Sequence, residues 1–210
     1  QLAGRWAGRV PEAGTLVEEK RDGFRCLFFP GLDRQPALWT RNGMPMPGAG
    51  HILVRLLEVE QQLGAPHFID GEFQVGSTLA ATKLHYDSGW RAGDAGTFYA
   101  FDCVPMPDWE RGRCYIPLYD RKAALVRAIE TTAPRPDDWE WRAGSRGKDH
   151  GIDPLSSIPD QWLFTADEIR AEASRVWARG GEGLMIKDAE APYVRARSDA
   201  WQKLKKAGVA

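Results

Sequence analysis

The sequence has few cysteines and no long apolar run. Its three cysteines, Cys26, Cys103 and Cys114, are odd in number and widely spaced, which argues against a disulfide framework and matches no metal-ligand spacing. No apolar run approaches the roughly 18 residues that a membrane-spanning helix needs, and no charged-then-apolar leader begins the chain. These absences lead us to expect a reduced intracellular protein of a bacterial or phage-like kind, in the cytoplasm or nucleoid, with no membrane partner.

Basic residues are not in excess either. The 28 lysines and arginines meet 29 aspartates and glutamates, so the formal net charge is −1. This near-neutral net charge argues against a protein that binds nucleic acid over its whole surface, although it does not exclude local basic patches. Charged residues make up 27% and apolar residues 43% of the 210 residues, which is ordinary for a globular protein with one substantial core.

Hydrophobic patterning predicts a mixture of strands and helices. Strands are expected at residues 15–17, 24–29, 37–40, 67–73, 97–104, 184–187 and 198–206. Helices are expected at residues 51–63, at 120–132 with Asp120 as N-cap, and at 165–179, where Thr165 and Glu168 form a capping box. Less regular stretches are 75–96, read as a short helix and a surface loop with an exposed His85, and 133–160, where Trp139 and Trp141 alternate as in an edge strand and 145–151 reads as a mobile loop.

The segment from Glu18 to Arg25 lies between two apolar runs, and its Asp22-Gly23 pair predicts a tight turn that joins two strands. Lys20 in such a hairpin is either a solvated lysine or a covalent carrier of a nucleotidyl group. An amine attacks phosphorus only when unprotonated, so a carrier site must lower an ammonium pKa that is about 10.4 in model peptides, by burial or by nearby positive charge. Arg25 and a bound metal are candidates for that charge.

Lys20 to Arg25 resembles the K-x-D-G-x-R nucleophile motif of the ATP-dependent DNA ligases, within the wider superfamily of covalent nucleotidyltransferases. Four further stretches resemble the later motifs of that family and follow in its order. They are Asp70-Gly71-Glu72, the aromatic strand around Phe101-Asp102, Glu182-Gly183 to Lys187, and Trp201-Gln202-Lys203-Leu204-Lys205. The resemblance extends to Arg41, in a turn after a strand, and to Arg197, although Ala196 replaces the glycine that the family places before that arginine.

The resemblance implies an α+β fold in which two antiparallel sheets with flanking helices hold the nucleotide in the groove between them. Lys20 would be the catalytic nucleophile that forms lysyl-AMP from ATP; AMP then passes to a 5′-phosphate at a nick, and the 3′-hydroxyl displaces it. The residues implied in ATP or AMP binding are Glu18, Glu19, Lys20, Arg25, Arg41, Glu72, Phe101, Lys187, Arg197, Lys203 and Lys205. Glu72 and Glu182 would hold Mg²⁺ or Mn²⁺.

Several assignments have alternatives. Arg41 is equally well an ordinary loop arginine, some aromatic residues beside Phe101 are expected in the core, and Lys205 with Lys206 could form a basic tail. At the level of function, the alternatives are an RNA ligase, a GTP-dependent capping-type enzyme, and an inactive nucleotide-binding module.

The resemblance also bears on domains and partners. We expect residues 1–210 to form one adenylation domain and the C-terminal OB-fold domain of such ligases to be absent from this chain, supplied by the full-length protein or in trans. The expected partner is nicked double-stranded DNA, and the expected oligomeric state is a monomer. By itself, the chain is expected to hold AMP well but to self-adenylate slowly and seal nicks poorly.

Overall fold

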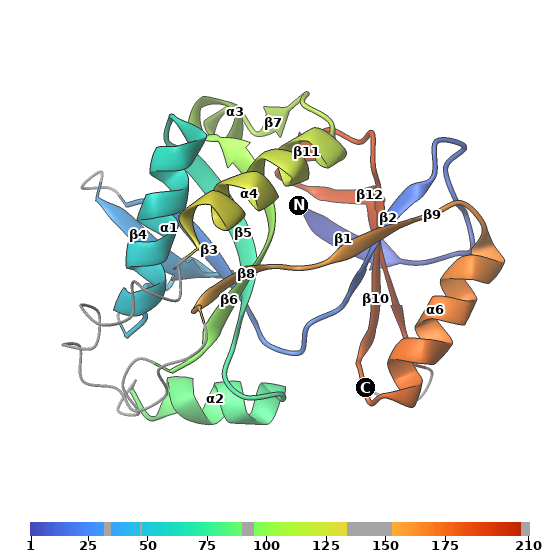
Figure 1. Cartoon of the computed structure of the whole chain (residues 1–210), viewed down its shortest axis with the longest axis horizontal. Coiled ribbons are helices and arrows are strands. Elements are labelled where there is room, and N and C mark those ends of the chain that lie inside the picture. Colours follow the sequence, from blue (N-terminus) through green and yellow to red (C-terminus); the bar gives the residue numbers. More distant parts are fainter. Residues whose placement is uncertain (32–34, 47, 90–94, 134–152, 207–210) are drawn as a thin grey trace. The chain divides into compact units, whose positions relative to one another are not determined.

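The computed structural model describes residues 1–31, 35–46, 48–89, 95–133 and 153–206 (Figure 1). They belong to two compact units. Unit 1 comprises Gln1–Asp22, Val104–Ala123 and Ile158–Ala210, and unit 2 comprises Gly23–Cys103 and Ala124–Ser157. The expected edge strand at Trp139 and Trp141 and the expected loop at 145–151 lie outside the described residues.

Unit 1 is built on a five-stranded sheet with the order β1-β12-β10-β2-β9. Its strands are β1 (Leu2–Arg5), β2 (Thr15–Glu19), β9 (Asp160–Leu163), β10 (Gly183–Asp188) and β12 (Arg197–Lys205). The strand β1 runs parallel to β12, and the other neighbours are antiparallel. The unit also contains the short helix α3 (Met106–Glu110) and a small antiparallel pair, β7 (Arg113–Cys114) with β11 (Tyr193–Val194).

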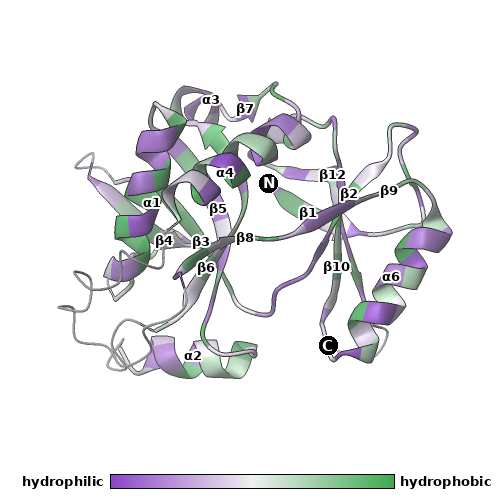
Figure 2. Ribbon diagram, viewed as in Figure 1, coloured by the Kyte–Doolittle hydropathy of each residue, from purple (hydrophilic) through white to green (hydrophobic). Residues whose placement is uncertain are grey.

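The helix α6 (Ala166–Ala178) packs on the unit 1 sheet. It begins where expected, because the Thr165 side chain accepts a hydrogen bond from the Glu168 amide and the Glu168 carboxylate accepts one from the Thr165 amide. Figure 2 shows that α6 carries both hydrophilic and hydrophobic residues. The apolar ones form a core with the sheet, whose buried members are Val17, Ile169, Ala173, Val176, Leu184 and Ile186.

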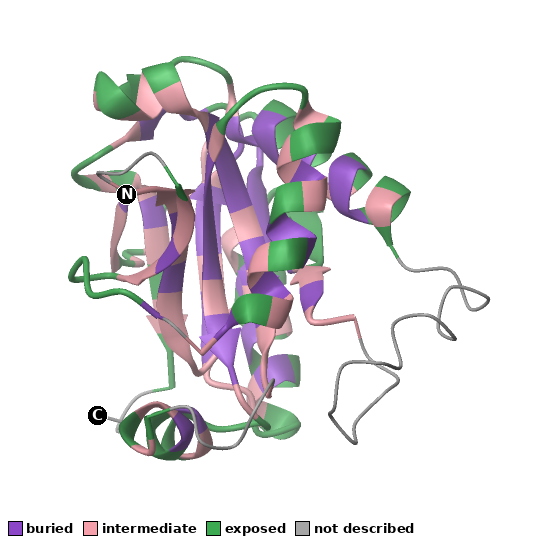
Figure 3. Cartoon of the chain, turned by 90° about the vertical axis from the view of Figure 1, so that its left-hand side faces the viewer, coloured by how far each residue is buried: buried purple, intermediate pink, exposed green. Residues whose placement is uncertain are grey.

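Unit 2 is built on a second five-stranded sheet with the order β4-β3-β5-β6-β8. Its strands are β3 (Phe24–Pro30), β4 (Pro36–Thr40), β5 (His67–Gln74), β6 (Thr97–Pro105) and β8 (Leu155–Ser157). Its helices are α1 (Gly50–Leu63), α2 (Leu79–Asp87) and most of α4 (Leu118–Thr132). In Figure 3 the strands of this sheet are coloured buried or intermediate, whereas the helices also carry exposed residues, as expected for amphipathic helices on a sheet.

The α+β fold class is confirmed, with one refinement: the edge pairs β1/β12 and β6/β8 are parallel. Cys26, Cys103 and Cys114 are all buried. The start of α4 was predicted too late, because the helix begins at Leu118 and Asp120 lies in its first turn. Among the described residues, no helix has the length and apolarity needed to cross a membrane.

The expected hairpin across Asp22-Gly23 is wrong. The strand β2 pairs with β9 and β10 in unit 1, whereas β3 pairs with β4 and β5 in unit 2. Gly23 does not adopt the positive φ that a two-residue hairpin turn requires. A glycine is needed at this position because the backbones of residue 23 and Phe73 approach each other closely. A Cβ on residue 23 would lie 2.3 Å from the Phe73 carbonyl oxygen.

The expected position of His85 is also wrong. His85 lies in α2 and is 4% exposed, whereas the sequence predicted an exposed histidine in a surface loop. Burial lowers the pKa of His85 below its ordinary 6.5, and the charge of His51 adds to this effect. Because the folded state disfavours the protonated ring, the stability it contributes is complete above about pH 6.5 and is lost as pH falls through the lowered pKa.

We therefore expect the free energy of unfolding to fall between about pH 6.5 and the lowered pKa of His85, and this slope to be reduced in His85→Gln. Urea unfolding of both proteins across this range measures the difference. An equal slope in the two proteins would assign the pH dependence to other groups.

Candidate active site

Four lysines and Glu18 lie on one face of the unit 1 sheet. In the register of β2, β10 and β12, Met185 lies between Glu18 and Lys203. In the same way, Lys187 lies opposite Leu16, and Lys205 lies opposite Gly183. Since side chains alternate along a strand, this register gathers on one face a set that we call the lysine face. Its members are Glu18, Lys20, Lys187, Lys203 and Lys205. The opposite face carries the core residues that pack on α6.

Lys20 follows the last residue of β2 and is held at both its backbone and its side chain. Its amide donates to the carbonyl of Gly183 at 2.9 Å. Its ammonium donates to Glu182 Oε2 at 2.5 Å and to the carbonyl of Arg21 at 3.3 Å, and its side chain is 22% exposed. Lys205 pairs with the other oxygen of Glu182. The sequence predicted that Glu182 would lie just outside a strand, and β10 does begin one residue later.

Gly183 permits this arrangement because its backbone has φ 147°, and a Cβ there would lie 2.0 Å from the Leu204 carbonyl oxygen. We expect Gly183→Ala to lower the free energy of unfolding by about 2 kcal/mol through strain and to displace the backbone that holds Lys20. Chemical denaturation measures the loss. Gly180→Ala is the matched control, because Gly180 also has a positive φ of 87° but no atom lies within 4 Å of the added Cβ; an equal loss in both variants would show that contact with Leu204 is not the cause.

Beside Lys20 on the same face lies a set of charges that we call the charged cluster: Glu18, Lys122, Asp160 and Lys187. The first two and Lys187 are buried, whereas the Asp160 side chain is 25% exposed. One Glu18 oxygen contacts Lys122, and the other lies 2.6 Å from Lys187 Nζ. Lys122 also lies 2.7 Å from Asp160 Oδ2. The Lys187 ammonium is 4.4 Å from the centre of the Trp201 ring, where the aromatic face favours a cation.

Unit 2 carries a separate group of predicted residues. Arg25 on β3 lies opposite Glu72 on β5, so both point to the same face of their sheet. Arg25 Nε donates to Asp70 Oδ1 at 2.9 Å, its Nη2 contacts the other oxygen, and the guanidinium lies 5.8 Å from the centre of the Phe101 ring. Phe98, by contrast, is fully buried in the core, as expected for part of that strand. Glu72 Oε1 accepts a hydrogen bond from the Gly23 amide at 3.3 Å.

Three predicted residues lie apart from these groups. Glu19 alternates to the opposite face of the sheet and pairs with Arg179 at 2.7 Å. Arg197 is exposed and donates to the Ala3 carbonyl at 2.8 Å. Arg41 is exposed in the turn after β4. Their contacts with a nucleotide stay predictions.

The sequence reasoning missed Lys122 and Asp160. A signal for Lys122 was available, because it lies four residues after Leu118 and three before Leu125, both fully buried, and so occupies the apolar stripe of α4. A lysine in such a stripe needs a buried partner. For Asp160 no comparable signal exists, because its partners come from distant parts of the sequence.

A metal ion at this site would take carboxylate ligands. Within the described ranges, no group of three or more His, Cys, Asp or Glu residues could hold a metal by itself. Mg²⁺ in nucleotide-using sites is usually bound by one or two carboxylates together with substrate phosphates. Glu182, which lies among the lysines, fits this mode of binding. The described residues do not form a dedicated all-protein metal cage.

The chain is similar in sequence to known proteins. The chain is 28% identical over 220 residues to a DNA ligase of Halobacterium salinarum, a match that covers 95% of this chain and 34% of the relative. It is 26% identical to a probable DNA ligase of Koribacter versatilis, covering 91% of this chain and 35% of that protein. This chain therefore spans about a third of the length of these relatives.

Solved structures share the fold at lower identity. A chain described as "Pmar-Lig_Pre." has a TM-score of 0.77 and 19% identity, covering 98% of this chain and 46% of its own length. The Chlorella virus DNA ligase-adenylate has a TM-score of 0.63 and 19% identity, covering 97% of this chain and 66% of its own. The family model of the ATP dependent DNA ligase domain matches residues 7–205. This chain belongs to that family.

Proposed function

We propose that this chain is the adenylation domain of an ATP-dependent DNA ligase and that Lys20 is its nucleophile. The observation that carries the proposal is the position of Lys20, held by Glu182 at the end of β2 on the face that presents Lys187, Lys203 and Lys205. Such a face is suited to a triphosphate, because lysines such as the exposed Lys203 and Lys205 are point charges that can neutralise phosphate oxygens.

The first step would be an in-line displacement at the α-phosphorus of ATP. The Lys20 ammonium gives up one proton, for which the contacting Glu182 carboxylate is the nearest acceptor, and the amine then attacks. A nitrogen–phosphorus bond forms, the bond from phosphorus to the bridging oxygen breaks, and pyrophosphate leaves with the electron pair. The attacking nitrogen then loses its second proton. The work of the protein is positioning and charge stabilisation.

The later steps follow the same chemistry. The proposed acceptor is a 5′-phosphate at a nick in double-stranded DNA, one of whose oxygens displaces Lys20 from AMP. The 3′-hydroxyl then displaces AMP and closes the phosphodiester. We propose that an OB-fold domain, in a longer chain or in trans, assists these steps and that the protein acts as a monomer.

The unit 2 residues would bind the nucleoside part of ATP. The Phe101 ring can stack on the base, an interaction that contributes about 1–3 kcal/mol, and the Arg25 guanidinium beside it is oriented by Asp70. Glu72 and Glu182 are the carboxylates proposed to hold Mg²⁺. When bound, the ion would neutralise phosphate charge.

The test is incubation of the chain with Mg²⁺ and either α-labelled ATP or α-labelled GTP, followed by denaturing electrophoresis and acid treatment. We expect an acid-labile label from ATP alone. Label from GTP would instead support a capping-type enzyme. No label from either, together with no pyrophosphate-dependent release of AMP from the purified chain, would support an inactive module, whereas such release without label would indicate that the OB-fold domain is needed for the first step. Chasing the labelled protein with nicked DNA or nicked RNA then identifies the acceptor, and transfer to RNA alone would contradict the DNA ligase assignment.

A further inference from the structure

The Lys122 ammonium has two carboxylate partners in the charged cluster. Its side chain is 3% exposed, contacts one oxygen of Glu18, and lies 2.7 Å from Asp160 Oδ2. The other Glu18 oxygen is occupied by Lys187, and both of those side chains are 1% exposed. Glu18 is thus clamped between two lysines, one from α4 and one from β10.

Stability alone is a weak reason for this arrangement. Lys122 occupies the apolar stripe of α4, where an apolar residue of similar volume would avoid the desolvation of an ammonium. Buried ion clusters often stabilise no more than such apolar replacements do, although removal of one partner leaves the others uncompensated. The location of the cluster suggests another role, since Glu18 precedes Lys20 by two residues and shares its face of β2.

The cluster is also balanced in charge. Two lysines offset two carboxylates, so the cluster adds no net charge to the lysine face, whose other members are Lys20, Lys203 and Lys205. Without Lys122, the cluster would carry one net negative charge on this face, and the Glu18 carboxylate would lose one of its two lysine contacts. Both changes would disfavour an anionic ligand beside Lys20.

We propose that Lys122 is a positioning residue for adenylyl transfer, which acts through Glu18 on Lys187 and on the end of β2 that carries Lys20. The inference rests on the proposed function but concerns a residue outside the motifs of the family resemblance. It makes a specific claim about coupling: the effect of Lys122 on ATP use depends on the Glu18 carboxylate.

The experiment is a double-mutant cycle with Lys122→Met, Glu18→Gln and the double variant, using the rate of adduct formation at varied ATP concentration and the Kd for ATP. We expect Lys122→Met to lower kcat/KM at least tenfold, mainly by raising KM, and to have little further effect when Glu18 is already glutamine. Lys122→Arg should restore most of the loss, because it keeps the charge. Arg127→Met, on an exposed position of the same helix, is the matched control and should leave the rate unchanged.

Thermal unfolding of every variant accompanies the kinetics. Equal kcat/KM in Lys122→Met and the unmodified chain would overturn the inference, as would independent, additive losses from the two single variants. If the unmodified chain forms no adduct, the same cycle is judged from the Kd for ATP, and the proposed function fails if pyrophosphate also releases no AMP from the purified chain. Absence of both adduct and ATP binding in the unmodified chain would overturn both proposals.

Discussion

Replacing Lys20 by arginine is expected to abolish the covalent AMP adduct. Arginine keeps the positive charge that contacts Glu182, but its guanidinium stays protonated near neutral pH and cannot attack phosphorus. The loss should be complete within detection, since no neighbouring group supplies the same bond. Intact mass spectrometry after incubation with ATP and Mg²⁺ measures it directly, as the adduct adds one AMP to the chain.

Two comparisons make this result specific. Lys83→Arg, at an exposed position of α2, should form the adduct as the unmodified chain does. ATP binding by Lys20→Arg, measured by equilibrium dialysis, should persist, because the other lysines of the face remain. Adduct formation by Lys20→Arg at the normal rate would place the nucleophile on another residue, and peptide mapping would then identify it.

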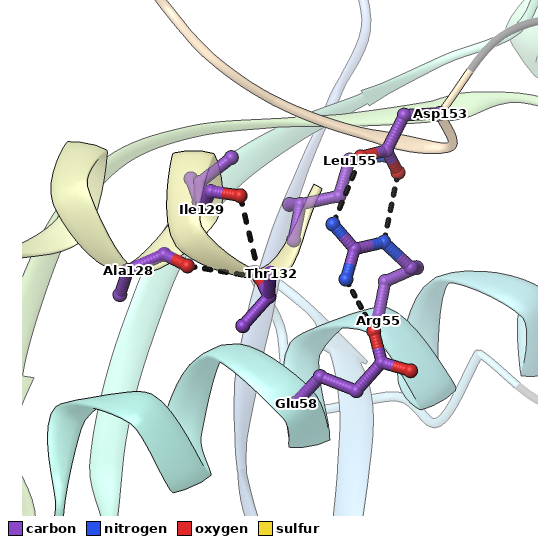
Figure 4. Close-up of polar contacts among 7 residues, drawn as sticks. All are labelled: Arg55, Glu58, Ala128, Ile129, Thr132, Asp153 and Leu155. Carbon is purple, nitrogen blue, oxygen red and sulfur yellow. Dashed lines mark hydrogen bonds and ion pairs between the residues drawn. The ribbon is translucent and has the colours of Figure 1, made fainter. Parts of the chain in front are cut away.

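Replacing Arg55 by leucine is expected to give the largest loss of stability. Arg55 is 2% exposed on α1 and donates through Nε and Nη2 to Asp153 at 3.0 and 2.9 Å, while its Nη1 contacts Glu58 (Figure 4). Asp153 Oδ1 in turn accepts a hydrogen bond from the Leu155 amide at 3.1 Å, at the start of β8. Arg55 thus ties α1 to the segment that leads into the edge strand.

Leucine would leave both carboxylates without this partner. Breaking such a pair costs about 3 kcal/mol, at the lower end of values for buried pairs because Asp153 and Glu58 are partly exposed. The melting temperature should fall by roughly 6–12 °C for a chain of this size. Calorimetry or urea unfolding measures the change.

The matched control is Lys83→Ala, which removes an exposed ion pair with Asp87 one helical turn away. Exposed pairs of this spacing contribute about 0.3–0.5 kcal/mol, so the change should be small. If Arg55→Leu lost no more than this control, the Arg55 contacts would be energetically equivalent to a surface ion pair.

Local sequence determined most of the secondary structure. The capping box at Thr165 and Glu168 and the helical phase of residues 51–63 correspond to α6 and α1, because the interactions that start and phase a helix lie within a few residues of one another. Strand alternation likewise places Lys203 and Lys205 on one face and Leu204 on the other, where it packs against the core.

Tertiary structure decided the strand partners. Asp22-Gly23 has the composition of a hairpin turn, yet β2 and β3 enter different sheets, because the edges of β2 are paired with β9 and β10, strands more than 130 residues away. A local pattern contains no information on which distant strand offers the better edge. The same limit explains the two neighbouring glutamates: Glu18 is clamped by two lysines, whereas Glu19 faces Arg179 on the other side of the sheet.

The sequence by itself therefore determined which functional groups are present and in what order: a lysine, carboxylates, an arginine and an aromatic ring in the order of the ligase motifs. Only the tertiary structure decided which of them touch. It paired Lys20 with Glu182 and brought Lys122 and Asp160 to Glu18. Contacts of this kind depend on the packing of α4, β9 and β10 around β2, and the desolvation and Coulomb energies that shape the site arise only once that packing has formed.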